Sequence, residues 1–223
     1  MTDAAQAAAP AVPEVKEVPA WRLLATLGVG GAIAGLLLVV VYQATLPAIE
    51  AYKAKKLREA IHEVLKGPAR HETLYLVGGK LTAELPDGAD PKQLERIYLG
   101  FDANKRPVGF AIAAGEAGFQ DVIELIFGYD PASRKLLGMK VLESKETPGL
   151  GSKIESDAHF IGQFDGVVGP VKGVKKGRGT GADNEVDMIT GATISSSAVI
   201  RIINDALKTW TPYIEAYRAR SDG

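Results

Sequence analysis

Hydrophobic positions along this 223-residue chain form one long uninterrupted run, followed by shorter periodic stretches. The run, Leu23–Val41, contains 19 residues and no charge. An apolar helix of that length spans the hydrocarbon core of a bilayer, so we predict a transmembrane helix over residues 21–45. A cleaved signal peptide is the competing interpretation. The length of the run, its late start and the lack of a small-x-small site after it argue against cleavage.

The segments on either side of this run differ in composition. Residues 1–20 are rich in Ala, Pro and Val and are predicted to form a flexible tail. After the run, Pro47 fits the first turn of a new helix. The apolar face of that helix extends to about Lys66, and residues 46–70 are therefore predicted to be a linking helix. Lys and Arg are more numerous after the run than before it, but long domains translocate largely regardless of charge, which leaves the orientation open.

From Glu72 onward the pattern changes to short apolar stretches typical of β-strands. Residues 121–143 are predicted to form a hairpin, and Ser156–Phe164 a short helix. The Gly-rich, basic segment Gly166–Gly181 is predicted to be a loop or an exposed hairpin. Together these elements predict an α+β domain over residues 71–223. The strands are expected at residues 73–77, 96–99, 108–113, 122–129 and 136–142.

A helical pattern follows in the C-terminal part of the chain. Apolar residues recur at helical spacing from Ile194 to Trp210, and a last turn or two of amphipathic helix is expected from there to Arg220. Thr193 is therefore predicted to lie at or just before a helix N-terminus, where free N–H groups and the helix dipole favour a phosphate. Gly191 and Ala192 are small residues, so a bulky group could reach the backbone beside Thr193. On local chemistry alone, an ordinary capped helix is the simpler interpretation.

A second stretch with unusual backbone requirements is Glu146-Thr147-Pro148-Gly149-Leu150-Gly151. Pro148 fixes φ, and Gly149 and Gly151 adopt positive φ readily, so a tight, defined loop is expected. Main-chain groups in such a loop can approach a flat ring closely, although a plain turn is the alternative. A Walker-type phosphate loop is excluded because the Gly-Lys-Ser/Thr spacing is missing.

Composition excludes several classes of function. The net charge is −1, and the basic segment lacks interleaved aromatic residues, so a nucleic-acid partner is not expected. The chain has no cysteine, which excludes disulfides, a thiol nucleophile and a Cys-ligated iron–sulfur cluster. His62, His71 and His159 are scattered along the chain, so ordinary surface or packing roles are expected for them rather than metal ligation.

Two motifs in order carry a family resemblance. Residues 187–193 match every fixed position of the flavinylation motif Asp-x-x-(Ser/Thr)-Gly-Ala-Thr, whose last Thr carries FMN through a phosphoester bond. With Glu-Thr-Pro-Gly-Leu-Gly about forty residues earlier, the chain resembles the FMN-binding domain family of RnfG, a component of the Rnf electron-transport complex. NqrC, a component of the Na+-translocating NADH:quinone reductase, shares both motifs. The matching residues are Asp187, Thr190, Gly191, Ala192 and Thr193.

The resemblance implies an anchored electron carrier without a catalytic residue of its own. FMN would be attached covalently to Thr193 by a flavin transferase that uses FAD. Asp187 and Thr190 would serve in recognition or positioning, and residues 146–151 would lie against the isoalloxazine. The partners would be the other components of an Rnf complex that couples electron flow between NADH and ferredoxin to ion translocation.

The resemblance also implies a location. The chain would cross the bacterial inner membrane once, with its flavin domain on the periplasmic side. Two alternatives remain open at this point. One is an NqrC-like component of the quinone reductase or another membrane-anchored flavoprotein with the same domain, and the other is a periplasmic binding or assembly module without flavin.

Overall fold

The computed structural model describes residues 19–221. The predicted flexible tail, residues 1–20, lies outside this range apart from its last two residues. The chain divides into two compact units, Met1–Tyr52 and Lys53–Gly223, which are described in turn. The division of the chain into tail, transmembrane helix, linking helix and domain stays a prediction.

The first unit contains most of helix α1, Ala20–Val64. Within the described residues, α1 is the one helix that is long and apolar enough to cross a membrane, with a mean hydropathy of 2.4 over its most apolar window. The prediction that a new helix begins at Pro47 is wrong, because α1 continues through this residue. A proline inside a helix removes one backbone hydrogen bond, and here the turns on both sides keep the helix continuous.

The second unit is built on a seven-stranded sheet in the order β2-β1-β3-β4-β5-β6-β7, in which all neighbours are antiparallel. All five predicted strands are confirmed as β1, β3, β4, β5 and β6, and the predicted hairpin is the β5–β6 pair. The strands are β1 Arg70–Val77, β2 Lys80–Thr82, β3 Arg96–Phe101, β4 Pro107–Ala117, β5 Val122–Asp130, β6 Lys135–Glu143 and β7 Asp165–Val168.

The segment predicted to be a loop or hairpin, Gly166–Gly181, is instead partly strand. It supplies most of β7, which pairs with β6, and all of β8 (Lys172–Lys175). Strand β8 pairs in parallel with β9 (Glu185–Met188) in a separate two-stranded sheet. Strands β7 (Asp-Gly-Val-Val) and β8 (Lys-Gly-Val-Lys) each contain a glycine and show no alternation of apolar and polar residues, so local sequence does not reveal them.

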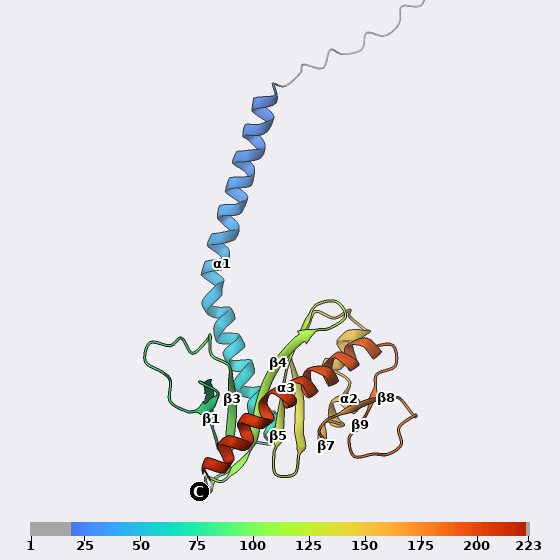
Figure 1. The fold of residues 1–223 in the computed structure, drawn as a ribbon. Helices are drawn as coiled ribbons and strands as arrows, with labels where there is room; N and C mark the ends of the chain where they lie inside the picture. Colours follow the sequence, from blue (N-terminus) through green and yellow to red (C-terminus); the bar gives the residue numbers. More distant parts are fainter. Residues whose placement is uncertain (1–18, 222–223) are drawn as a thin grey trace, which may run out of the picture. The chain divides into compact units, whose positions relative to one another are not determined.

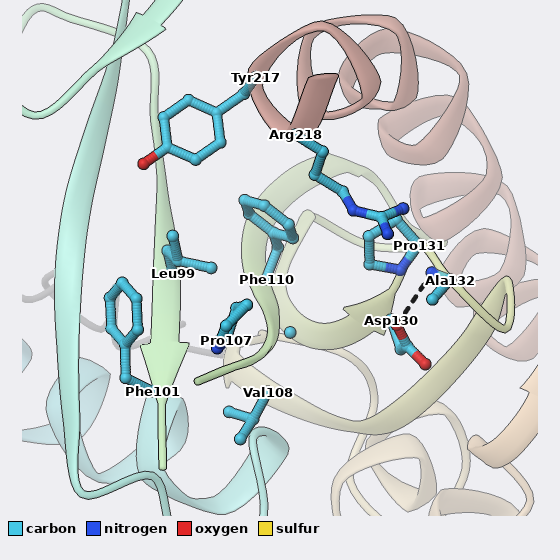
Figure 2. A pocket seen from close by; sticks show the side chains of 11 residues that line it. Leu99, Phe101, Pro107, Val108, Phe110, Asp130, Pro131, Ala132, Tyr217 and Arg218 are labelled. Atoms are coloured by element: carbon cyan, nitrogen blue, oxygen red, sulfur yellow. Dashed lines mark hydrogen bonds between the residues drawn. The ribbon is translucent and has the colours of Figure 1, made fainter. Parts of the chain in front are cut away.

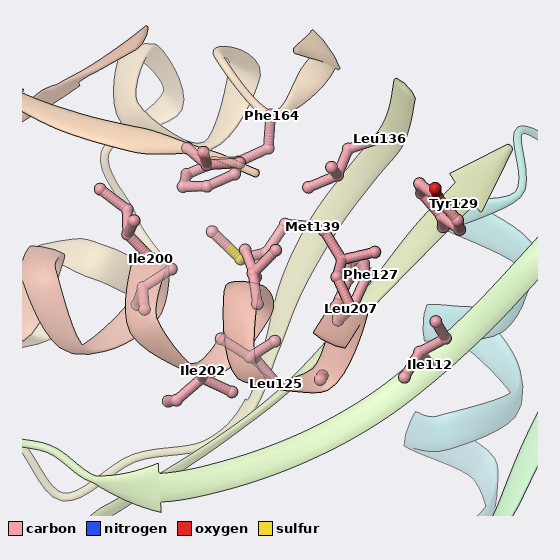
Figure 3. Packing of buried hydrophobic residues seen from close by; sticks show 14 of the residues in the cluster. Ile112, Leu125, Phe127, Tyr129, Leu136, Met139, Phe164, Ile200, Ile202 and Leu207 are labelled. Atoms are coloured by element: carbon pink, nitrogen blue, oxygen red, sulfur yellow. The ribbon is translucent and has the colours of Figure 1, made fainter. Parts of the chain in front are cut away.

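One face of the large sheet is covered by α3, Thr193–Ser221 (Figure 1). Side chains from β4, β5 and β6 interlock there with those from α3 and with Phe164, which follows the short helix α2 (Ala158–Gly162) (Figure 3). The short helix predicted over Ser156–Phe164 is confirmed as α2, with narrower bounds, and Phe164 lies buried just after it. Pro212 lies inside α3, so the predicted C-terminal turns are the continuation of one helix.

The other face of the sheet is covered by the last turns of α1. Ala60, Ile61 and Val64 pack there against Tyr98 and Ile126. The contact is close enough that a side chain at Gly128 on β5 would overlap the Val64 carbonyl oxygen. The sheet is therefore covered on both faces, by α3 on one face and by the end of α1 on the other.

Candidate functional site

A hollow of about 360 Å³ lies where three segments meet. The start of α3 forms one side, the loop before the 3-10 helix η1 (Gly151–Glu155) forms another, and the turn between β4 and β5 forms the third. Seven of the residues predicted from sequence line this hollow. They are Glu146, Thr147, Leu150, Gly151, Gly191, Ala192 and Thr193.

Glu146 ties these three segments together. Its side chain is 5% exposed, and its oxygens accept hydrogen bonds from the backbone N–H groups of Phe119 (2.8 Å) and Gln120 (3.0 Å) and from Ser195 Oγ (2.5 Å). Burial acts to raise the pKa of Glu146, but these hydrogen bonds outweigh it and hold the pKa below its ordinary value. The carboxylate is therefore an ionised, buried anchor that positions the walls of the hollow.

Gly149 and Gly151 shape the loop in different ways, because the positive φ expected at both is observed at Gly149 and not at Gly151. Gly149 has φ of +76°, and its N–H donates to Ser152 Oγ at 3.0 Å. Gly151 is buried, and a Cβ there would lie 2.5 Å from Glu146 Oε2 and 2.7 Å from Ser195 Oγ. Gly151 therefore allows the loop to pack directly on the Glu146–Ser195 hydrogen bond.

Thr193 is the first residue of α3, as predicted. The backbone N–H groups of Thr193, Ile194 and Ser195 have no acceptor among residues 19–221. The first N–H groups of a helix lack intrahelical partners and carry the positive end of its dipole. A phosphate attached at Thr193 Oγ would meet three free donors and a favourable field.

Large apolar side chains surround this helix start and remain exposed. Phe119 is 64% exposed, Leu150 is 52% exposed and Ile194 is 59% exposed. The sequence pattern places Ile194 with the apolar residues of α3, but its side chain lines the hollow and does not enter the core. Exposed apolar residues gathered around a hollow indicate a binding site for an apolar group.

Asp187 and Thr190 do not line the same hollow. They border a neighbouring one of about 210 Å³, together with Lys153, His159 and Lys176. Asp187 is held through its main chain, because its N–H donates to Gln163 Oε1 at 2.7 Å and its carbonyl accepts from Gln163 Nε2 at 3.2 Å. The motif therefore presents Asp187 and Thr190 on one surface and Gly191 to Thr193 on another.

Comparisons with known proteins decide the family. The family described as the FMN-binding domain matches residues 118–208. The chain is 32% identical over 196 residues to the G subunit of the ion-translocating oxidoreductase complex of Methanosarcina acetivorans, covering 87% of this chain and 94% of that protein. The chain belongs to the RnfG family of ion-translocating oxidoreductase complexes.

A second relative is also the G subunit of such a complex. The chain is 28% identical over 196 residues to the G subunit of the Na(+)-translocating ferredoxin:NAD(+) oxidoreductase complex of Acetobacterium woodii, covering 85% of this chain and 93% of that one. Among solved structures, NqrC of Shewanella oneidensis superposes with a TM-score of 0.61 at 18% identity over 74% of this chain and 99% of that one. At that identity the structural likeness shows a shared fold.

The matched FMN-binding domain, residues 118–208, contains all of the residues that line the hollow. Its residues suit FMN, because exposed apolar side chains can cover a flat ring and the N–H groups at the start of α3 can bind a phosphate. Three lining residues, Phe119, Ile194 and Ser195, do not stand out from the sequence as site residues. In the sequence, Ser195 looks like a helix-capping residue. The structure shows instead that its hydroxyl donates a 2.5 Å hydrogen bond to buried Glu146 and so links the start of α3 to the loop.

Proposed function

We propose that this chain is a membrane-anchored electron carrier whose FMN is joined through its phosphate to Thr193 Oγ. The observation that carries the proposal is the position of Thr193. Thr193 is the first residue of α3 and lines the apolar hollow. It lies beside N–H groups that have no acceptor in residues 19–221. When bound, FMN supplies the one- and two-electron chemistry, and the protein contributes binding, orientation and electrostatics.

Attachment needs a phosphoryl donor and a separate enzyme. In the proposed reaction, Thr193 Oγ attacks the FMN phosphorus of FAD within a flavin transferase. A phosphoester bond forms, the pyrophosphate bond breaks, AMP leaves and the hydroxyl proton is released. Asp187 and Thr190 are the proposed contacts for the transferase, since both border the accessible neighbouring hollow. Gly191 and Ala192 leave room beside the acceptor hydroxyl.

Within the hollow, the loop of residues 146–151 would lie against the isoalloxazine. Leu150 and Thr147 line the hollow directly, while Pro148 and Gly149 shape the loop behind it. Glu146 has its oxygens occupied by protein donors, so its role is to position the loop and to hold a negative charge near the ring. A fixed carboxylate near a flavin disfavours added negative charge and lowers the midpoint potential.

The proposed partners are the other components of an Rnf-type complex. The relatives are named as subunits of ion-translocating oxidoreductase complexes, one of them a ferredoxin:NAD(+) oxidoreductase. In this proposal α1 crosses the bacterial inner membrane and the flavin domain lies on the periplasmic side. The carrier then relays electrons between neighbouring components while staying attached to the membrane.

The alternatives are less well supported. The two relatives described above, which cover 87% and 85% of this chain, are subunits of ion-translocating oxidoreductase complexes, whereas the likeness to NqrC rests on fold at 18% identity. A module without flavin leaves unexplained why Phe119, Leu150 and Ile194 are exposed together around the start of α3.

The test is flavin attachment in threonine variants. Wild type, Thr193→Val and Thr209→Val chains are produced with an active flavin transferase, denatured and separated on a gel, and flavin fluorescence is recorded. Thr209 lies on the exposed side of α3 and serves as the matched control. We expect fluorescence in wild type and Thr209→Val and none in Thr193→Val. A fluorescent Thr193→Val band would contradict the proposal.

A further inference from the structure

A second hollow, of about 320 Å³, lies at the opposite end of α3 from Thr193 (Figure 2). It is bordered by β3, β4, the turn after β5 and the last turns of α3. Tyr217 and Arg218 follow Thr193 by about 24 residues, and at ~1.5 Å per residue they lie roughly 36 Å from it along the helix. This hollow is therefore separate from the proposed flavin site.

Aromatic rings form the walls of this second hollow. Phe101 comes from β3, Phe110 from β4 and Tyr217 from α3. The rings of Phe110 and Tyr217 meet edge to face, with centroids 6.4 Å apart and an interplanar angle of 89°. The guanidinium of Arg70 lies 4.1 Å from the centroid of Phe101. Rings fixed in this way form a preorganised surface for a flat apolar group.

Arg218 adds a positive charge to these apolar walls. It is half-buried and lies beside the turn that contains Pro131 and Ala132 (Figure 2). Within residues 19–221, its guanidinium has no hydrogen bond, ion pair or aromatic partner. The nearby carboxylate of Asp130 is already used by its own turn, accepting from Ala132 N–H at 2.9 Å and from Ser133 Oγ at 2.6 Å.

A half-buried guanidinium without a partner loses hydration and gains nothing in return. Its planar array of donors matches a carboxylate, which it binds through two parallel hydrogen bonds. The geometry points to a second binding site on this chain, for a small planar aromatic carboxylate. The ring lies among Phe101, Phe110 and Tyr217, and the carboxylate pairs with Arg218.

The size of the hollow limits the ligand further. A volume of about 320 Å³ is at the lower end of the range for small-molecule sites. It accommodates one or two rings with a single acidic group, and it is too small for a dinucleotide. The site is thus distinct from the proposed FMN site in position and in the group that holds the anion, which is a guanidinium here and the start of a helix there.

Photolabelling of the full-length chain in detergent tests this inference. The probe is 4-benzoylbenzoate, an aromatic carboxylate that inserts into nearby C–H bonds on irradiation, and 4-benzoylbenzamide is its neutral control. Labelled peptides are mapped by mass spectrometry. The variant is Arg218→Gln, and the matched control is Arg220→Gln. Arg220 carries the same charge in the same turn, but it donates to the carbonyls of Ala216 and Leu81, outside the hollow.

We expect saturable labelling by the carboxylate in peptides that contain Phe101 to Phe110 or Tyr217. Arg218→Gln should weaken half-saturation about tenfold or more, because a charged hydrogen-bonded pair is lost. Arg220→Gln should label as wild type does, and the amide should label weakly at any concentration tested. Equal labelling of wild type and Arg218→Gln, equal labelling by acid and amide, or labels confined to α1 or to the Thr193 region would each overturn the inference.

Discussion

Replacing Glu146 tests the architecture of the flavin hollow most severely. This carboxylate is 5% exposed and accepts hydrogen bonds from donors in two separate segments. Glu146→Ala leaves the hydroxyl of the buried Ser195 without its acceptor and removes the acceptor of the N–H groups of Phe119 and Gln120, which belong to exposed residues. Glu146→Gln keeps the shape and an amide oxygen but removes the charge that strengthens each bond.

The cost follows from the number of donors. A buried donor left without an acceptor costs about 1–3 kcal/mol. With that penalty for Ser195 and about 0.5–1.5 kcal/mol for each of the two bonds from exposed residues, Glu146→Ala should lower the free energy of unfolding by roughly 2–6 kcal/mol. Glu146→Gln should lower it by about 1–3 kcal/mol, the difference between charged and neutral hydrogen bonds. Since domains are stable by about 5–15 kcal/mol, the Ala variant approaches the limit of folding.

Urea unfolding measures these free energies. The chain has two tryptophans, and Trp210 lies buried in α3, so its fluorescence reports the domain once Trp21 is replaced by Phe. The control is Glu143→Gln, because Glu143 is an exposed carboxylate paired with Lys53, and such pairs contribute about 0–1 kcal/mol. A Glu146→Ala variant no less stable than Glu143→Gln would refute the reasoning.

The pH dependence gives an independent check with a definite sign. Burial acts to raise the pKa of Glu146 in the folded chain, but hydrogen bonds from Ser195, Gln120 and Phe119 outweigh it and hold the pKa below its ordinary value. The unfolded chain therefore binds this proton at higher pH, and the contribution is complete above the ordinary pKa of ~4.3 and is lost as pH falls through the folded value. The stability difference between wild type and Glu146→Gln should accordingly shrink as pH falls below about 5.

Three further predictions concern the sheet, the loop and an ion pair. Gly128→Ala should separate the end of α1 from β5 and destabilise the domain by at least about 2 kcal/mol in urea unfolding, whereas Gly162→Ala, which meets no neighbour, should be nearly neutral. Gly149→Val, forced to a φ near +76°, should shift the flavin absorbance or midpoint potential, and unchanged values would count against the loop's role. Hydrogen bonding to Lys172 lowers the pKa of Glu185 to about 2, so NMR titration of its carboxyl should show a higher midpoint in Lys172→Met; an unchanged midpoint would exclude Lys172 as the main cause.

Elements with a strong local signal were predictable from the sequence. The uninterrupted apolar run beginning at Leu23, five of the seven strands of the large sheet and the helix beginning at Thr193 have clear local patterns and appear as expected, whereas β2 and β7 were not predicted. The loop of residues 146–151 was predictable because Pro148 fixes φ and Gly149 permits a positive φ that other residues rarely adopt. These features depend on residues close together in the chain.

Features that depend on distant contacts were not predictable. Strand β7 has no alternating pattern of its own and forms by pairing with β6, which lies before η1 and α2 in the chain. Pro47 looks like a helix start, yet the helical residues on both sides continue α1 through it. The role of Glu146 comes from a hydrogen bond to a serine 49 positions away in the sequence. Ile194 fits the apolar pattern of α3, and only the position of the hollow explains its exposure.

The central claim is that Thr193 carries FMN, and the mass of the denatured chain from its native membranes tests it most directly. The account predicts a mass greater by one FMN less one water, with the added mass on the peptide that contains Thr193. Thr193→Val from the same cells should lack the increment. A native chain of unmodified mass, or an increment on a peptide without Thr193, would contradict the account.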